Sequence, residues 1–460
     1  MKKQIKKALR QSLGILTLSF LFALMPSCKK YLEAKPDGKL TVPQTLTDFQ
    51  AILDAAPMSN NYPSAGDIGS DYYYLSDNAW QTISLIDMRN DYIWDANAAN
   101  DYDWLYMYTM ILNANIVIDG AGKVPADGSN LADRNRVLGA GYFFRGYDHY
   151  ALTGEFEAPY IPGGDNSGPG LPLKLKADIT DPTKRSSIRQ TFSQIIADLK
   201  TAAALLPVDV IVKSRPSKAA AFGALARVYL TMGDFRNANL YADSCLQLSP
   251  ALIDYNRVSA TAPTPFKIFN EEVVFHNASA GRGSVFSTSR EMADTSLLAS
   301  YDSNDLRKAV FFKPGASGSI FKGDYGGSKT PVFAGIAADE MYLVRAETAV
   351  RTGNVSAGIG DLNTLLAKRF ASNTFVPYNT GMDADAALRL VLSERRKELP
   401  YRSGLRWNDL RRLNQEPGFA KSLSRNLGGV SYTLPPGDKR YTFLIPVSVV
   451  QQTGIAQNPR

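Results

Sequence analysis

Cysteine and histidine are scarce in this chain of 460 residues, which contains only Cys28, Cys245, His149 and His276. One thiol besides Cys28 cannot build an intrachain disulfide framework. Zinc sites commonly use Cys and His ligands, and a Ser-His-Asp arrangement needs a histidine. HExxH, CxxC and P-loop patterns are also absent. We therefore predict no metal ligand, no cofactor and no enzymatic activity, with calcium left open. A glycosidase remains an alternative because it needs only two of the 44 acidic residues.

A hydrophobic run long enough to cross a membrane is missing near the N-terminus. Leu13 to Met25 is 13 residues long, whereas a membrane-spanning helix needs about 20. The run is followed by Pro26-Ser27-Cys28 and preceded by five basic residues, Lys2, Lys3, Lys6, Lys7 and Arg10. This order is typical of a secretory signal, and the Cys after a small residue indicates acylation. We predict a lipoprotein signal peptide at 1–27, lipidation of Cys28 and a mature protein at 28–460. An ordinary cleaved signal is the alternative.

A strong excess of positive charge is absent from the predicted mature chain. The net charge of +7 (51 basic minus 44 acidic) falls to +2 (46 minus 44) once the five basic residues of the signal are removed. Nucleic-acid binding needs a clustered basic surface, so we expect no nucleic-acid partner. The basic segment Glu394 to Arg412 is interpreted as scaffold, because a neighbouring apolar stripe leaves its charges to solvent or to buried carboxylates.

Helical periodicity is the strongest pattern that the chain does contain. Apolar residues recur at helical spacing on both sides of a Gly233-Asp234 turn within Lys218 to Leu248, which predicts an antiparallel helical hairpin. The unit recurs 120 residues later, where Gly353-Asn354 matches the turn. Further helices are expected at 101–120, 133–152 and 192–206. The stretches 153–172 and 250–331 are rich in Gly and Pro, and a strand is expected at Val273 to Phe275. The predicted fold is mainly α, with stacked tetratricopeptide-like hairpins, long ordered loops and a few short strands.

Five segments of the mature chain resemble the SusD/RagB family. They are Cys28 to Pro36, Arg185 to Pro207, Asn270 to Phe275, Ser393 to Leu399 with Arg406 to Arg412, and Tyr441 to Asn458. Two departures are Ser403-Gly404-Leu405-Arg406-Trp407, where Glu-Gly-His-Arg-Trp is common, and Val449, where an acid is frequent. The resemblance implies a surface-exposed lipoprotein of the Bacteroidetes outer membrane. It also implies a SusC-type TonB-dependent transporter as partner and an oligosaccharide, or in some members a peptide, as ligand.

Aromatic and polar residues near the N-terminus are the predicted ligand contacts. Sugar sites combine an aromatic platform with directed hydrogen bonds, and family ligand contacts tend to come from this region and from long insertions. Trp94, Trp104 and Trp407 lie in scaffold-like segments, which leaves Trp80. The predicted ligand-binding residues are Trp80, Tyr73 and Asn78, followed by Arg282 and Tyr325. A glycan-capturing lipoprotein is favoured over a peptide-capturing relative or a tetratricopeptide adaptor without a small ligand.

Overall fold

The computed structural model describes residues 42–279, 285–287 and 290–460. The predicted signal peptide, Cys28 and the ligand candidate Arg282 lie outside these residues. The chain divides into two compact units, Met1–Pro43 and Gln44–Arg460, and the description below concerns the second. Among its described helices, none combines the length and the apolar character that crossing a membrane requires.

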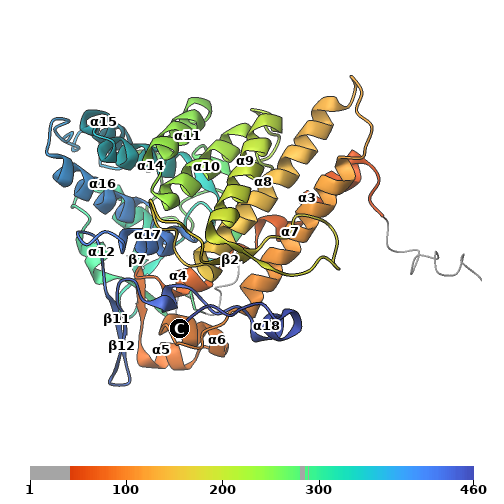
Figure 1. The fold of residues 1–460 in the computed structure, drawn as a ribbon. Helices are drawn as coiled ribbons and strands as arrows, with labels where there is room; N and C mark the ends of the chain where they lie inside the picture. Colours follow the sequence, from red (N-terminus) through yellow and green to blue (C-terminus); the bar gives the residue numbers. More distant parts are fainter. Residues whose placement is uncertain (1–41, 280–284, 288–289) are drawn as a thin grey trace, which may run out of the picture. The chain divides into compact units, whose positions relative to one another are not determined.

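Antiparallel helical hairpins form an array along one side of this unit (Figure 1). Successive neighbours in the array are α7 (Asp101–Ala121), α8 (Leu131–Phe156), α9 (Ile188–Leu205), α10 (Lys218–Met232), α11 (Phe235–Leu248), α14 (Ala338–Arg351) and α15 (Val355–Leu366). The helix α3 (Leu46–Leu53) packs on α7 and α8, and α16 (Ala384–Glu398) packs on α14. The fold is therefore mainly α, and the predicted hairpins are confirmed.

The two hairpins related by the 120-residue spacing turn in the same way. Gly233 and Gly353 both adopt positive φ, at 73° and 90°, a conformation that costs glycine nothing and ends a helix. Asp234 then caps α11 by accepting a hydrogen bond from an amide of its first turn, and Asn354 caps α15 likewise. Helix stop and helix start are thus encoded by adjacent residues in both copies.

Short elements form the rest of the unit. The strands make six two-stranded antiparallel sheets in the described residues: β1 (Tyr73–Leu75) with β6 (Glu291–Ala293), β2 (Pro169–Pro172) with β3 (Arg185–Ser187), β4 (Val273–Phe275) with β10 (Ile336–Ala337), β5 (Ala278–Ser279) with β9 (Val332–Phe333), β7 (Phe312–Pro314) with β8 (Ser319–Phe321), and β11 (Leu423–Leu427) with β12 (Val430–Leu434). The short helices are α4 (Ala65–Gly69), α5 (Asp77–Gln81), α6 (Ile86–Tyr92), α12 (Thr295–Ala299), α13 (Leu306–Phe311), α17 (Leu405–Leu413) and α18 (Val447–Thr453). The strand expected at Val273 to Phe275 is confirmed.

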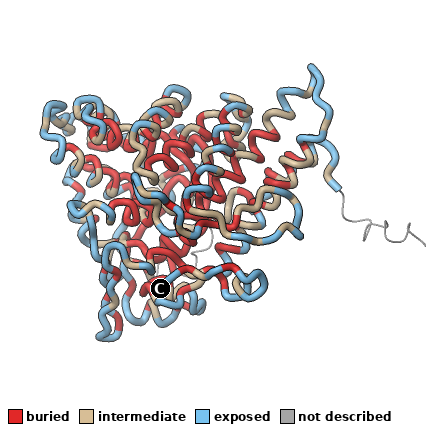
Figure 2. The backbone as a smooth tube through the Cα atoms, in the orientation of Figure 1, coloured by how far each residue is buried: buried red, intermediate tan, exposed pale blue. Residues whose placement is uncertain are grey.

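Buried residues follow the inner faces of the helices, whereas the outer turns and the tip of the β11–β12 hairpin are exposed (Figure 2). Trp94, Trp104 and Trp407 are all buried, as their scaffold-like segments predicted. His149 is fully buried and its Nδ1 lies 2.8 Å from the Arg145 carbonyl. Burial lowers the pKa of His149 to about 3, so this histidine is a neutral core residue at physiological pH.

The basic segment Glu394 to Arg412 is scaffold, as predicted. Arg395 donates to Asp409 at 2.8 Å, and Arg412 donates to Glu347 at 2.5 and 2.8 Å. These charges are mostly buried, and a buried charge needs a partner of opposite sign. The segment therefore fastens α16 and α17 to the helical array.

Candidate functional site

A polar cleft lies between β1, the N-cap of α12 and the edge of β11. We call it the Tyr74 cleft, and it encloses about 410 Å³. It is lined by Asp71, Tyr73, Tyr74, Leu75, Tyr92, Trp94, Asp294, Lys421, Ser422, Leu423, Ser424, Arg425 and Asn426. One wall therefore comes from residues 71–94 and the other from residues 421–426.

Strand alternation in β1 turns Tyr74 toward the cleft and the preceding Tyr73 toward the core. Tyr74 is 38% exposed, and Tyr73 beside it on the chain points into the core, where its hydroxyl donates to the Ile68 carbonyl at 2.7 Å. Successive side chains of a strand point to opposite faces. The β7–β8 turn comes close to Tyr74, because a Cβ added at Gly318 would lie 3.3 Å from the Tyr74 hydroxyl.

The same alternation in β11 supplies polar groups across the cleft. Ser424 and Asn426 are exposed, while Arg425 between them is buried. The Arg425 guanidinium lies 3.5 Å from the ring centre of Tyr92 and 4.6 Å from that of Trp94, and it donates to the Ser70 carbonyl at 2.6 Å. This wedge holds β11 against α4 and α6. The outward serine and asparagine are left for a ligand.

An ion network fixes the floor of the cleft. Asp71 accepts from Arg406 at 2.6 and 2.8 Å and from Lys421 at 2.6 Å. Burial pushes the pKa of Asp71 upward, but the neighbouring cations outweigh it and hold the pKa well below its ordinary value. Asp294 caps α12 and accepts from Arg396 at 2.8 Å. Burial likewise opposes these hydrogen bonds, and the pKa of Asp294 is still lowered. Both carboxylates are therefore charged at neutral pH.

The predicted ligand contacts end up in different surroundings. Asn78 is exposed on α5, the helix that follows β1. Trp80, on the same helix, is half-buried, and its indole N–H donates to the Arg89 carbonyl at 3.2 Å. Tyr73 lies beneath the cleft with its ring 4.7 Å from that of Phe286. These three residues share one region of the fold, but Tyr73 has little exposed surface.

Tyr325 is fully buried, unlike the exposed platform that its prediction assumed. Its hydroxyl donates to Glu272, and the Arg402 guanidinium lies 4.0 Å from its ring centre. In this conformation its ring offers no face to a ligand. The glycine-rich sequence around Tyr325 does not reveal that the segment folds back into the core. The second-tier candidate Arg282 lies outside the described residues.

Residues of β11 were missed, although a signal for them was present. Leu423 to Leu427 alternates apolar and polar residues, Gly428-Gly429 follows, and Val430 opens a second run. Two alternating runs around a two-residue glycine turn are typical of a β-hairpin. Nothing in the sequence, however, places this hairpin opposite Tyr74.

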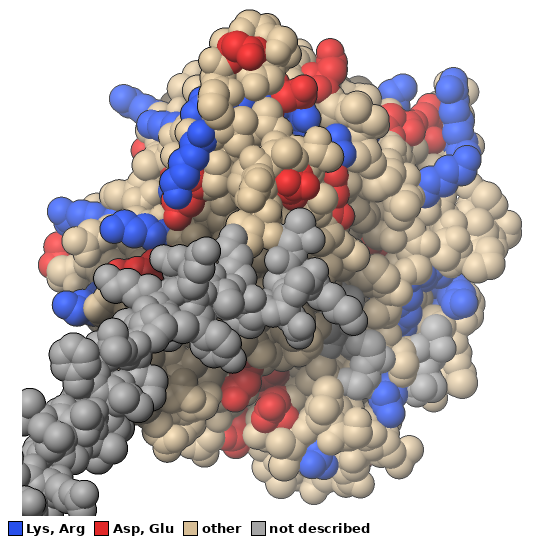
Figure 3. Space-filling view, turned by 90° about the vertical axis from the view of Figure 1, so that its right-hand side faces the viewer, with Lys and Arg blue, Asp and Glu red and all other residues tan. Residues whose placement is uncertain are grey.

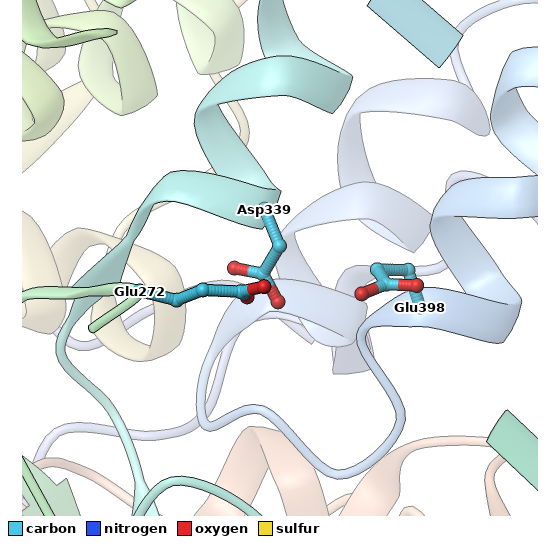
Figure 4. A group of neighbouring side chains, drawn as sticks. All are labelled: Glu272, Asp339 and Glu398. Carbon is cyan, nitrogen blue, oxygen red and sulfur yellow. The ribbon is translucent and has the colours of Figure 1, made fainter. Parts of the chain in front are cut away.

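Three buried carboxylates, Glu272, Asp339 and Glu398, come close enough to suggest a metal site (Figure 4), since one oxygen of each lies within 4.8 Å of the others. Their oxygens already accept hydrogen bonds from arginines. Arg369 donates to Glu398 at 2.7 Å and to Glu272 at 2.8 Å, and Asp339 accepts at 2.8 Å from a second guanidinium, that of Arg402. The guanidinium groups neutralise the carboxylates that a cation would need. We therefore interpret the cluster as an ion network of the core.

Charged side chains of both signs are interspersed on the face that Figure 3 shows, among a mostly uncharged surface. The described part of this face carries basic residues singly or beside acidic ones. Such a mixture differs from the basic stripe that follows a phosphate backbone.

Comparison with known proteins shows that the chain is similar to one family. A family model described as "Starch-binding associating with outer membrane" matches residues 30–230. SusD-like protein P2 of Formosa agariphila is 25% identical in an alignment 390 positions long that covers 71% of this chain and 74% of that protein. The chain is therefore similar to the SusD/RagB family.

Solved structures share the fold of this chain along nearly its whole length. A putative sugar-binding protein from Bacteroides vulgatus superposes with a TM-score of 0.74 at 21% identity, over 91% of this chain and 99% of that one. Surface glycan-binding protein A from Bacteroides fluxus superposes with a TM-score of 0.68 at 17% identity, over 91% of this chain and 100% of that one. The helical array and the segments that frame the Tyr74 cleft therefore belong to a fold shared across the family.

Proposed function

We propose that this protein is a SusD/RagB outer-membrane lipoprotein that captures an oligosaccharide in the Tyr74 cleft. Cys28 would carry the lipid after removal of residues 1–27, and the protein would face outward. It would deliver its ligand, chemically unaltered, to a SusC-type TonB-dependent transporter.

The Tyr74 cleft is the observation that carries this proposal. The partly exposed ring of Tyr74 can stack on the flat, weakly apolar face of a pyranose. Opposite it, Ser422, Ser424 and Asn426 are exposed and make no side-chain hydrogen bond within the described residues. Hydroxyl and amide groups are donors and acceptors at once, which suits the hydroxyls around a sugar ring. The fixed ions below keep this arrangement in place before ligand arrives, which lowers the entropy lost on binding.

Affinity electrophoresis of the soluble chain, residues 29–460, against a panel of neutral and charged glycans tests the cleft. At least one glycan should retard the protein. Tyr74→Ala should weaken the interaction by a factor of about 2 to 10, the range that one ring contact supplies. Asn426→Ala should weaken it through a lost hydrogen bond. The matched control is Tyr102→Ala, which removes another exposed tyrosine, 44% exposed on α7.

Three outcomes would count against the proposal. Retardation by none of the glycans, together with binding of extended peptides, would favour the peptide-capturing alternative. Equal weakening by Tyr74→Ala and Tyr102→Ala would remove the cleft as the site. Release of shortened products during incubation with a bound glycan would show that the protein is an enzyme.

Cys28→Ala tests the anchor separately. Wild-type cells should incorporate labelled palmitate into the protein and retain it in the outer membrane, and co-purification should recover the transporter. The variant should lose the label and the membrane retention but keep glycan binding. Label retained in the variant would contradict lipidation at this position.

A further inference from the structure

A second cavity, here called the Phe269 pocket, shares no residue with the Tyr74 cleft. It encloses about 470 Å³ between residues 252–259, residues 265–271 and Lys368. All of these residues are described. A concave site of this size suits one or two sugar units, or another ligand of similar size.

Hydrogen bonds hold the walls of the Phe269 pocket in place. The Ile253 amide donates to Glu272 at 2.6 Å, and the Tyr255 amide donates to the Lys368 carbonyl at 2.9 Å. On the other wall, the Asn270 side-chain amide donates to the Lys267 carbonyl at 3.0 Å. These bonds join segments that lie up to about a hundred residues apart in the chain. The pocket is therefore a built feature of the core's edge.

Phe269 stands in this pocket in a backbone conformation that phenylalanine rarely adopts. Its φ is +57°, and a bulky residue in the left-handed region costs on the order of 1 kcal/mol or more. The ring is nevertheless 36% exposed. It meets the His276 ring edge to face, with ring centres 5.0 Å apart at 80°. The left-handed backbone at Phe269 thus holds a partly exposed aromatic ring at the edge of the pocket.

The pocket lining carries an excess of one positive charge, because Arg257, Lys267 and Lys368 outnumber Asp254 and Glu271. Arg257 and Lys267 line it, and neither has an ion pair within the described residues. Asp254 is already committed, since its carboxylate accepts from the Asn256 side chain at 2.8 Å and backbone at 3.1 Å and lies 3.9 Å from the Lys368 ammonium. A ligand in the pocket would therefore meet Arg257 and Lys267, together with the single exposed carboxylate of Glu271, beside an exposed ring.

We propose that the Phe269 pocket is a second saccharide subsite, selective for a pyranose that carries a carboxylate or a sulfate. The sugar face would stack on Phe269, and the anionic group would face Arg257 and Lys267. The inference rests on the proposed function in taking the ligand to be a saccharide. Two subsites on one chain would hold a long polymer more tightly than either alone, because the second contact becomes intramolecular.

The test uses the soluble chain, residues 29–460, in affinity electrophoresis with polygalacturonate, which supplies carboxylates, and dextran sulfate, which supplies sulfates. Neutral dextran and polyglutamate are run in parallel. The wild type should be retarded by one or both anionic polysaccharides. Added salt should reduce this retardation. Phe269→Ala should weaken this interaction by a factor of about 2 to 10. The double variant Arg257→Gln/Lys267→Gln should weaken it about tenfold or more, as expected for charged hydrogen bonds.

Matched variants separate this inference from the proposed function. Lys123→Gln removes an exposed lysine outside the pocket and should change nothing. Tyr74→Ala should leave anionic binding by the isolated Phe269 pocket in place, and Phe269→Ala should leave binding in the Tyr74 cleft in place. Anionic binding that Phe269→Ala does not weaken, or no anionic binding at all, would overturn the second subsite alone. Equal retardation by polyglutamate would overturn the assignment to saccharides.

Discussion

Glu157 provides a test of how burial controls the stability of this protein. The residue follows α8 and has no exposed surface. One carboxyl oxygen accepts from the Leu171 amide at 2.9 Å, and the other has no hydrogen-bond partner in the described residues. Burial raises its pKa to about 8, although hydrogen bonds from Thr191 and Leu171 and the charge of Arg411 act in the opposite direction. The folded protein therefore keeps this carboxyl protonated at neutral pH.

The direction of the pH effect follows from the two pKa values. Below pH 4.5, the ordinary value, the carboxyl is protonated in both the folded and the unfolded chain. Between pH 4.5 and 8 the unfolded chain releases the proton while the folded chain keeps it, so stability falls as pH rises. Each such pH unit changes the free energy of unfolding by about 1.4 kcal/mol. Glu157 should therefore lower stability by on the order of 3 to 4 kcal/mol between pH 5 and pH 8.

Glu157→Gln should remove this dependence. The amide has nearly the same shape, cannot ionise, and still offers an oxygen to the Leu171 amide. In urea unfolding at pH 5, 6, 7 and 8, the free energy of unfolding of the variant relative to that of the wild type should increase by several kcal/mol as pH rises. Other buried acids titrate in both proteins, so the difference between the two curves isolates Glu157. Glu271→Gln, at an exposed glutamate, is the control. Parallel curves for wild type and Glu157→Gln would refute the reasoning.

Two further substitutions probe the scaffold of the protein. Gly404→Ala should destabilise the protein more than Gly353→Ala. Both glycines have positive φ. An added Cβ at Gly404 would lie 2.8 Å from a tyrosine ring, whereas Gly353 faces open space. The strained backbone alone costs roughly 1 kcal/mol, and equal melting temperatures for the two variants would contradict the packing argument. Arg369→Met should cost about 3 to 5 kcal/mol in urea unfolding, because it removes the guanidinium that pairs with the buried Glu272 and Glu398, and only Glu398 keeps another arginine partner, Arg307. A loss below about 1 kcal/mol would show that Glu272 is protonated or otherwise neutralised.

The Gly404 prediction also bears on the departures from the family pattern. Ser403 replaces the usual acid, and its hydroxyl donates to Asp67 at 2.7 Å, while the Gly404 amide donates to the same carboxylate at 2.9 Å. Arg406 then binds Asp71, and Trp407 packs against Gly66 at the start of α4. The segment still fastens α17 to the chain that leads into β1. The changed residues therefore preserve the support of the Tyr74 cleft.

Local patterns in the sequence determined the helical part of this protein. Apolar spacing at helical period fixes which face of each helix is buried, and a glycine followed by Asp or Asn fixes where one helix stops and the next begins. Both signals act over a few residues, so Gly233-Asp234 and Gly353-Asn354 could be interpreted without knowing their neighbours. The scaffold role of Glu394 to Arg412 was equally legible, because its charges needed buried partners.

Only the tertiary structure decided which aromatic rings face solvent. Tyr73 and Tyr74 are adjacent and chemically identical, and the pairing of β1 with β6 sends one inward and the other into the cleft. Tyr325 is buried by carboxylate and arginine partners that lie 53 and 77 residues away in sequence. The cleft itself joins residues 71–94 to residues 421–426. Such contacts depend on how segments that lie up to hundreds of residues apart pack together, and local composition does not specify that packing.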